Sequence, residues 1–119
     1  MLGLIYYDAE YITQDISKAI YYFSMAANQN EPNAQLKLGM IYLENKYISR
    51  DINKAIHYLQ LASDLNFPEA QHNLGLIYYE GKYITQDIDK AIHYFMLASN
   101  QNIIQAQYML GFIYYTGKY

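Results

Sequence analysis

The histidines are the side chains with most chemical potential, because imidazole binds metal ions and exchanges protons near neutral pH. The chain has three of them, His57, His72 and His93. His57 and His93 lie 36 residues apart, at the same position of a repeat of that length. We therefore expect them on neighbouring helices roughly 10 Å apart, whereas the ligands of one metal ion lie about 2 Å from it. The pattern favours exposed histidines and no metal site.

The acidic residues suggest no catalytic pair. Asp87 and Asp89 flank a predicted helix start, where capping explains the first and exposure to solvent the second. The chain has no cysteine, which removes thiolate ligands, a cysteine nucleophile and disulfides together. The sequence also lacks a phosphate-binding glycine loop and a nucleophile elbow. We expect no enzymatic activity, no catalytic residue and no cofactor.

Charge and hydropathy limit the kinds of partner. The net charge is −3, and the eight Lys and Arg residues are spread along the chain, which argues against binding to nucleic acid. No segment approaches the roughly 18–20 apolar residues of a membrane span, and the N-terminal segment does not resemble a signal peptide. The absence of cysteine favours a reducing compartment, so we expect a cytoplasmic location.

An internal repeat dominates the sequence. The phrase YITQDISKAI at 11–20 returns as YISRDINKAI at 47–56 and YITQDIDKAI at 83–92, 36 residues apart each time. A fixed period of this length is typical of proteins in which each unit buries its apolar side against the next. The pattern predicts one domain over residues 1–119, made of repeats 1–36, 37–72 and 73–108 and a partial repeat 109–119.

Each repeat contains two helical patterns. In the first, which is clear over 33–45, Ala34, Leu38 and Ile41 recur at helical spacing, and Pro32 stands where such a helix would begin. The second follows an aspartate that we predict to be the N-cap, and it ends before an asparagine suited to a left-handed turn. The predicted caps are Asp15, Asp51 and Asp87, and the predicted helix ends are Asn30, Asn66 and Asn102.

A glycine recurs inside the first helix of every repeat. The four are Gly3, Gly39, Gly75 and Gly111. A glycine within a helix costs about 1 kcal/mol relative to alanine, so we expect an offset from close approach of a partner helix. The small residues predicted to supply the matching surface of the second helix are Ala19, Ala55 and Ala91.

The stretch NLGLIYYEGKYITQDIDKAIHYFMLASNQN (73–102) resembles the Sel1-like repeat, a relative of the tetratricopeptide repeat. The matching residues are Ala70, Leu74, Gly75, Tyr78, Gly81, Ile84, Asp87, Lys90, Ala91, Tyr94 and Ala98. The resemblance covers essentially the whole chain. It implies an all-α fold, a right-handed superhelical solenoid of stacked antiparallel helix hairpins, and a role as scaffold or adaptor. Ala9 and Asn45 replace the loop glycine seen at Gly81 and Gly117, so we expect the first two loops to differ.

The first helices of such solenoids line the concave side, where a partner usually binds. Columns that vary between repeats are the better candidates for recognition, and aromatic side chains there suit a peptide or an amphipathic helix. The candidates are Tyr7, Leu36, Lys37, Leu43, His72, Asn73, Tyr79, Tyr108, Met109 and Tyr115. These residues occupy three positions of the repeat. A fourth position is apolar in every repeat and is held by Leu4, Met40, Leu76 and Phe112. The alternative is that these side chains fill the seam between stacked repeats.

The resulting hypothesis is a protein–protein interaction module that binds a peptide or protein segment on its concave surface. A structural spacer within a longer repeat protein is the alternative. Solenoids normally end in polar capping repeats, but the segment FIYY at 112–115 is apolar. We therefore expect either a longer array or self-association through the uncapped ends.

Overall fold

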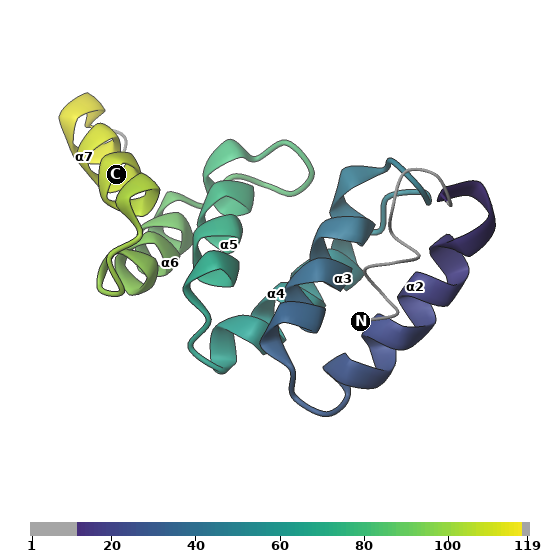
Figure 1. The fold of residues 1–119 in the computed structure, drawn as a ribbon. Coiled ribbons are helices and arrows are strands. Elements are labelled where there is room, and N and C mark those ends of the chain that lie inside the picture. The colour runs from purple at the N-terminus through teal and green to yellow at the C-terminus, as the bar shows by residue number, and fades with distance from the viewer. Residues whose placement is uncertain (1–11, 118–119) are drawn as a thin grey trace. The chain divides into compact units, whose positions relative to one another are not determined.

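The computed structural model describes residues 12–117, and every regular element in this range is an α-helix. The helices are α2 (Ile12–Ala27), α3 (Pro32–Glu44), α4 (Ile52–Asp64), α5 (Pro68–Glu80), α6 (Ile88–Ser99) and α7 (Ile104–Thr116) (Figure 1). They belong to two compact units, Met1–Leu65 and Asn66–Tyr119. Gly3 and Tyr7 lie outside the described residues.

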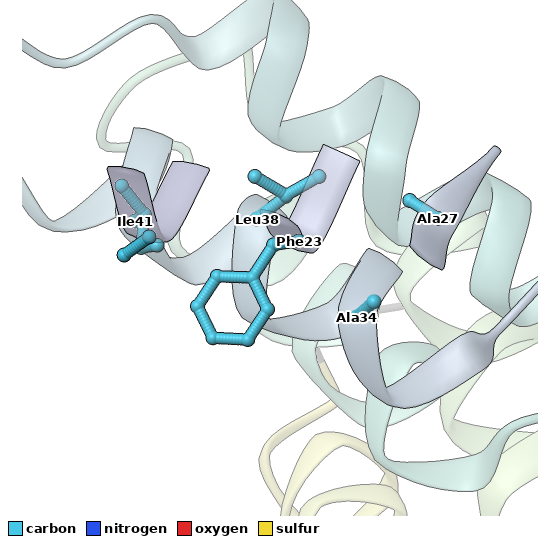
Figure 2. Close-up of a cluster of buried hydrophobic side chains, with 6 residues drawn as sticks. Phe23, Ala27, Ala34, Leu38 and Ile41 are labelled. Carbon is cyan, nitrogen blue, oxygen red and sulfur yellow. The ribbon is translucent and has the colours of Figure 1, made fainter. Parts of the chain in front are cut away.

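In the first unit, α2 packs against α3 and α3 packs against α4. Figure 2 shows the seam between α2 and α3, where Phe23 and Ala27 meet Ala34, Leu38 and Ile41. A helix of 13 to 16 residues is marginal in water by itself, and a fully buried Phe, Leu or Ile side chain contributes about 1.5–3 kcal/mol. The seam therefore stabilises these helices more than their intrinsic propensity does.

The second unit repeats this packing with α5 on α6 and α6 on α7. Ala70 and Leu74 of α5 take the places of Ala34 and Leu38 one period later, and both are fully buried. On α7 the fully buried residues are Ala106 and Ile113. The same apolar spacing thus produces the same inward face in successive first helices.

Aspartate caps begin the second helices of the two later repeats, as predicted. Asp51 and Asp87 have extended backbones with φ of −130° and −139°. Their carboxylates accept the N–H of Lys54 at 3.1 Å and of Lys90 at 3.0 Å. Each cap satisfies an N–H group that the helix leaves unpaired and places negative charge at the positive end of the helix dipole.

The same loops tie each second helix back to the end of the first. In both complete loops, the capping aspartate donates its N–H to a tyrosine carbonyl, Asp51 to Tyr42 and Asp87 to Tyr78, each at 2.9 Å. The residue before the cap donates its side chain to the next carbonyl. These bonds join Arg50 Nε to Leu43 O and Gln86 Nε2 to Tyr79 O, both at 2.7 Å. The loop thereby uses carbonyls that the helix end leaves unpaired.

The prediction that Asp15 is an N-cap is wrong. Helix α2 begins at Ile12, so Asp15 lies within its first turn and is buried. The preceding residues Ile12, Thr13 and Gln14 include neither glycine nor proline, so nothing in them stops the helix from starting earlier. A carboxylate in the first turn still meets the positive end of the dipole.

Asparagine ends the helical segments in the left-handed conformation, which confirms the prediction. Asn30, Asn66 and Asn102 have φ of 62°, 64° and 66°. Asn45 also adopts this conformation, with φ of 55° against 61° for Gly81. The backbone conformation at this position is therefore the same in both loops, because asparagine tolerates the left-handed region that glycine favours. The expected difference lies in the side chain, since Oδ1 of Asn45 accepts the N–H of Arg50 at 3.0 Å and glycine has no such group. Ala9 lies outside the described residues.

The glycines of α3 and α5 are holes filled by a large side chain from the second helix. A Cβ on Gly39 would lie 2.8 Å from Cγ of Leu59 and 3.3 Å from the carbonyl oxygen of Ala55. A Cβ on Gly75 would lie 2.7 Å from the ring of Phe95. The alanines predicted to match the glycines, Ala19, Ala55 and Ala91, are fully buried. At Gly39 and Gly75, however, the inserted group is the residue four positions after the alanine.

Gly75→Ala and Gly111→Ala should therefore have opposite effects on stability. The added methyl at position 75 meets a buried aromatic ring, and overpacking of this kind costs about 1–3 kcal/mol. A methyl at position 111 meets nothing within 4 Å, so the gain in helix propensity of about 1 kcal/mol remains. Urea unfolding followed by circular dichroism measures both. Equal effects at the two sites would contradict the packing role.

Candidate partner-binding surface

The predicted partner-binding residues divide by repeat. Those on α3 and α5 are half-buried: Leu36, Lys37, Leu43, His72, Asn73 and Tyr79. On α7, Met109 is half-buried, whereas Tyr108 and Tyr115 are 70% and 89% exposed. Tyr7 lies outside the described residues. The positions that vary in sequence between repeats therefore also differ in exposure, and the most exposed side chains lie on α7.

The exposed side chains of α7 form one aromatic stripe. Tyr108, Phe112 and Tyr115 are spaced i, i+4 and i+7, which places them on one side of a helix. The rings of Tyr108 and Phe112 stack with centroids 6.5 Å apart and planes 16° from parallel. Together with Gly111 these three residues line a shallow surface hollow. We call this set the α7 aromatic face.

The equivalent positions of α5 face the second helix of their own hairpin. His72 stands where α7 has Tyr108, and its ring lies 5.6 Å from that of Phe95 on α6. Gly75 stands where α7 has Gly111, and it lies against the same phenylalanine. These two positions therefore lie in the seam between α5 and α6, whereas the same two positions of α7 are exposed.

Burial also sets the charge of His72. Its Nδ1 is buried and has no hydrogen-bond partner among the described residues. Desolvation by burial lowers the pKa of His72 below its ordinary value of 6.5, because the protonated ring would lose its hydration. A neutral ring beside Phe95 fits the seam. This position serves packing more readily than ligand binding.

A glutamine network that the sequence analysis missed joins the ends of the second unit's hairpin. Gln71 is 1% exposed, and its Nε2 donates to Oδ1 of Asn66 at 3.2 Å. Gln101 Nε2 donates to Oε1 of Gln71 and to the carbonyl oxygen of Asn66, both at 3.0 Å. The signal was present as a glutamine that recurs every 36 residues, at 35, 71 and 107.

The first unit has the equivalent glutamine but not the equivalent hydrogen-bond network. Gln35 is 1% exposed and donates Nε2 to the carbonyl oxygen of Ala27 at 3.1 Å. Its Oε1 is buried and has no hydrogen-bond partner among the described residues. The position that corresponds to Gln101 is Leu65, which has no N–H group in its side chain.

The remaining histidines do not assemble a site. His57 and His93 are exposed, and each ring packs edge-on against the next residue, Tyr58 at 5.3 Å and Tyr94 at 5.1 Å. Within residues 12–117, no three His, Cys, Asp or Glu side chains cluster as metal ligands would. In the same range, no helix combines the length and apolarity needed to cross a bilayer.

The repeat organisation matches a known family along the whole chain. A sequence model of the Sel1 repeat matches residues 1–31, 32–67, 68–103 and 104–119. These units keep the 36-residue period (32 to 68 to 104) and start at the first helix of each pair. They begin five residues before the boundaries taken from the Leu-Gly phrase (32 against 37). No curated protein matches the chain.

Two solved structures are similar to this one. One is a Sel1 repeat protein from Oxalobacter formigenes, with a TM-score of 0.85 and 30% identity over 98% of this chain and 47% of that one. The other is a protective antigen present in uropathogenic Escherichia coli strains that displays an SLR fold, with a TM-score of 0.79 and 28% identity over 82% of this chain and 21% of that one. The chain thus spans about half and about a fifth of these proteins. Together with the helices, these likenesses confirm the predicted solenoid class.

Replacement of His72 by leucine, the residue at the same position of α3, should reduce the loss of stability on acidification. As the pH falls through 6.5, the unfolded chain takes up a proton at His72 that the folded chain takes up only at lower pH. Stability therefore falls with pH in the wild type and falls less in His72→Leu. Melting curves between about pH 7.5 and about pH 5.5 measure the difference. The exposed His57→Gln is the control, and an unchanged pH dependence in His72→Leu would refute the assignment.

Gln101→Leu should destabilise the chain. The variant copies the Leu65 arrangement and leaves Oε1 of Gln71 without the donor at 3.0 Å, and a buried acceptor without a partner costs about 1–3 kcal/mol. Gln29→Leu is the matched control at the same position of the first repeat. Among the described residues, Gln29 Nε2 donates only to Met25 O, at 3.3 Å in an exposed turn. Urea unfolding compares the two, and equal free energies of unfolding would argue against the network.

Proposed function

The chain belongs to the Sel1 repeat family, whose members are generally protein-interaction modules, and on that premise we propose that it is a scaffold or adaptor. It binds a peptide or protein segment on the surface of its first helices, which line the concave side in Sel1-like solenoids. The family is generally non-catalytic, and the proposal includes no enzymatic step. Its partner is a protein rather than a nucleic acid, because the net charge is −3.

The α7 aromatic face is the observation that carries this proposal. Tyr108 is 70% exposed, Tyr115 is 89% exposed and Phe112 is 39% exposed. A cluster of exposed aromatic side chains on one helix face marks a site of interaction, since such residues give a large contact area with little loss of conformational entropy. Their spacing along α7 suits an extended or helical segment laid against the helix.

A structural spacer within a longer repeat protein is the second candidate function. A spacer needs buried seams between repeats, and these are present in both units, but it does not need exposed aromatic rings. Exposed rings favour association and so reduce solubility unless a partner covers them. In a spacer the following repeat of the longer protein would cover this face, so the capture experiment below separates the two functions.

The double variant Tyr108→Ala, Tyr115→Ala should lose capture of the physiological partner. Immobilised wild-type and variant chains are compared by quantitative mass spectrometry of the proteins that each retains. Truncation of two central aromatic anchors should lower recovery of the partner roughly tenfold or more. Both side chains are exposed, so helicity measured by circular dichroism should stay unchanged.

Tyr21→Ala on α2 is the matched control, because it removes another exposed tyrosine (60%) from a second helix. It should retain the partner at the wild-type level. If the double variant and the wild type retain the same proteins in equal amounts, the assignment of binding to the first-helix surface is wrong.

A further inference from the structure

His72 places a titratable ring in the seam of the α5–α6 hairpin. The ring lies 5.6 Å from that of Phe95 on α6, with the ring planes 50° apart. The Nδ1 atom of His72 is buried and has no hydrogen-bond partner among the described residues. The same phenylalanine lies against Gly75, so His72 borders the contact that fixes how closely the two helices approach.

The α3–α4 hairpin of the first unit provides an internal comparison. Both hairpins have a capping aspartate, a glycine filled by a large side chain and a stacked pair of tyrosines. At the position of His72, however, α3 carries Leu36, which cannot take up a proton. The two hairpins therefore differ at this position in whether the side chain can gain a charge.

The closed α5–α6 seam accommodates a protonated ring poorly. Both nitrogens of an imidazolium are donors, and the buried Nδ1 has neither water nor an acceptor beside it among the described residues. Burial lowers the pKa of His72 below 6.5 for this reason. As the pH falls below 6.5, an open hairpin therefore takes up a proton that the closed hairpin takes up only at lower pH. Acid thus favours the open state.

The charged neighbours of this seam do not reverse that effect. The titratable residues of α6, the helix that packs on α5, are Asp89, Lys90, His93 and Tyr94. Asp89 and His93 are exposed, and Lys90 and Tyr94 lie against the ring of Tyr78. On α5 itself, the carboxylate of Glu69 is exposed three residues before His72. A carboxylate near the ring would raise its pKa, whereas the pKa of His72 is lowered, so burial outweighs these charges.

We propose that His72 is an acid-sensitive switch in the second unit. Protonation drives the ring out of the seam and loosens the α5–α6 hairpin, while the α3–α4 hairpin stays closed. Loosening of one hairpin is possible because the stability of a repeat protein is approximately a sum over units and interfaces, and proteins open locally in cooperative segments. Since α5 carries Asn73 and Tyr79 of the candidate surface, this part of the surface would also depend on pH. That consequence rests on the proposed function, whereas the switch itself does not.

Amide hydrogen exchange of the 119-residue chain, resolved by residue with NMR, tests the switch. Protection factors, which remove the direct effect of pH on exchange, are compared at about pH 7.5 and about pH 5.5. The amides of α5 and α6 should lose protection on acidification, whereas those of α3 and α4 should keep it. An equal change in both hairpins, or no change in either, would overturn the proposal.

Variants assign the effect to one side chain. His72→Leu, which copies the residue of α3, should abolish the loss of protection in α5 and α6. His72→Gln, which keeps a polar group but takes up no proton, tests the same point in case leucine alters the packing. His93→Gln is the control, because it removes an exposed histidine from the same hairpin and should leave the loss of protection as in the wild type. The proposal fails if the loss persists in both His72 variants or disappears in His93→Gln.

Discussion

The insertion of one large side chain into a glycine hole is the contact on which each hairpin depends. Leu59 enters at Gly39 and Phe95 enters at Gly75. A glycine within a helix costs about 1 kcal/mol, whereas burying such a side chain contributes about 1.5–3 kcal/mol, so the contact is favourable overall. It also fixes how closely the two helices approach. That approach lets the next loop donate the N–H of its capping aspartate to the first helix.

The two units share this contact but differ in the hydrogen bonds of their buried glutamine side chains. In the second unit Gln101 gives the buried Gln71 a donor, whereas Leu65 cannot do this for Gln35. The stability of a repeat protein is approximately a sum over units and their interfaces, so one residue outside the repeated phrase changes one unit without altering the architecture. The repeats therefore share their helix packing, and the residues that vary between repeats set the stability of each unit.

Features fixed by neighbouring residues were predictable from the sequence. The start at Pro32, the cap at Asp51 and the left-handed turn at Asn30 each depend on a few consecutive residues. Features that depend on the rotation of one helix against another were not predictable. The sequence suggested alanine as the partner of the helix glycine, whereas the structure shows Leu59 at Gly39, one turn further along the helix. The start of α2 upstream of Asp15 escaped prediction because its repeat carries the same phrase as the others.

The sequence could predict the candidate site only as a set of repeat positions, because the same position is buried in one repeat and exposed in another. His72 lies against Phe95 in a seam, and Tyr108, one period later, is 70% exposed. Nothing in the first helix decides between these states, since the covering helix decides. In α7 the glycine still lowers helix propensity, yet no described side chain fills its hole to offset that cost.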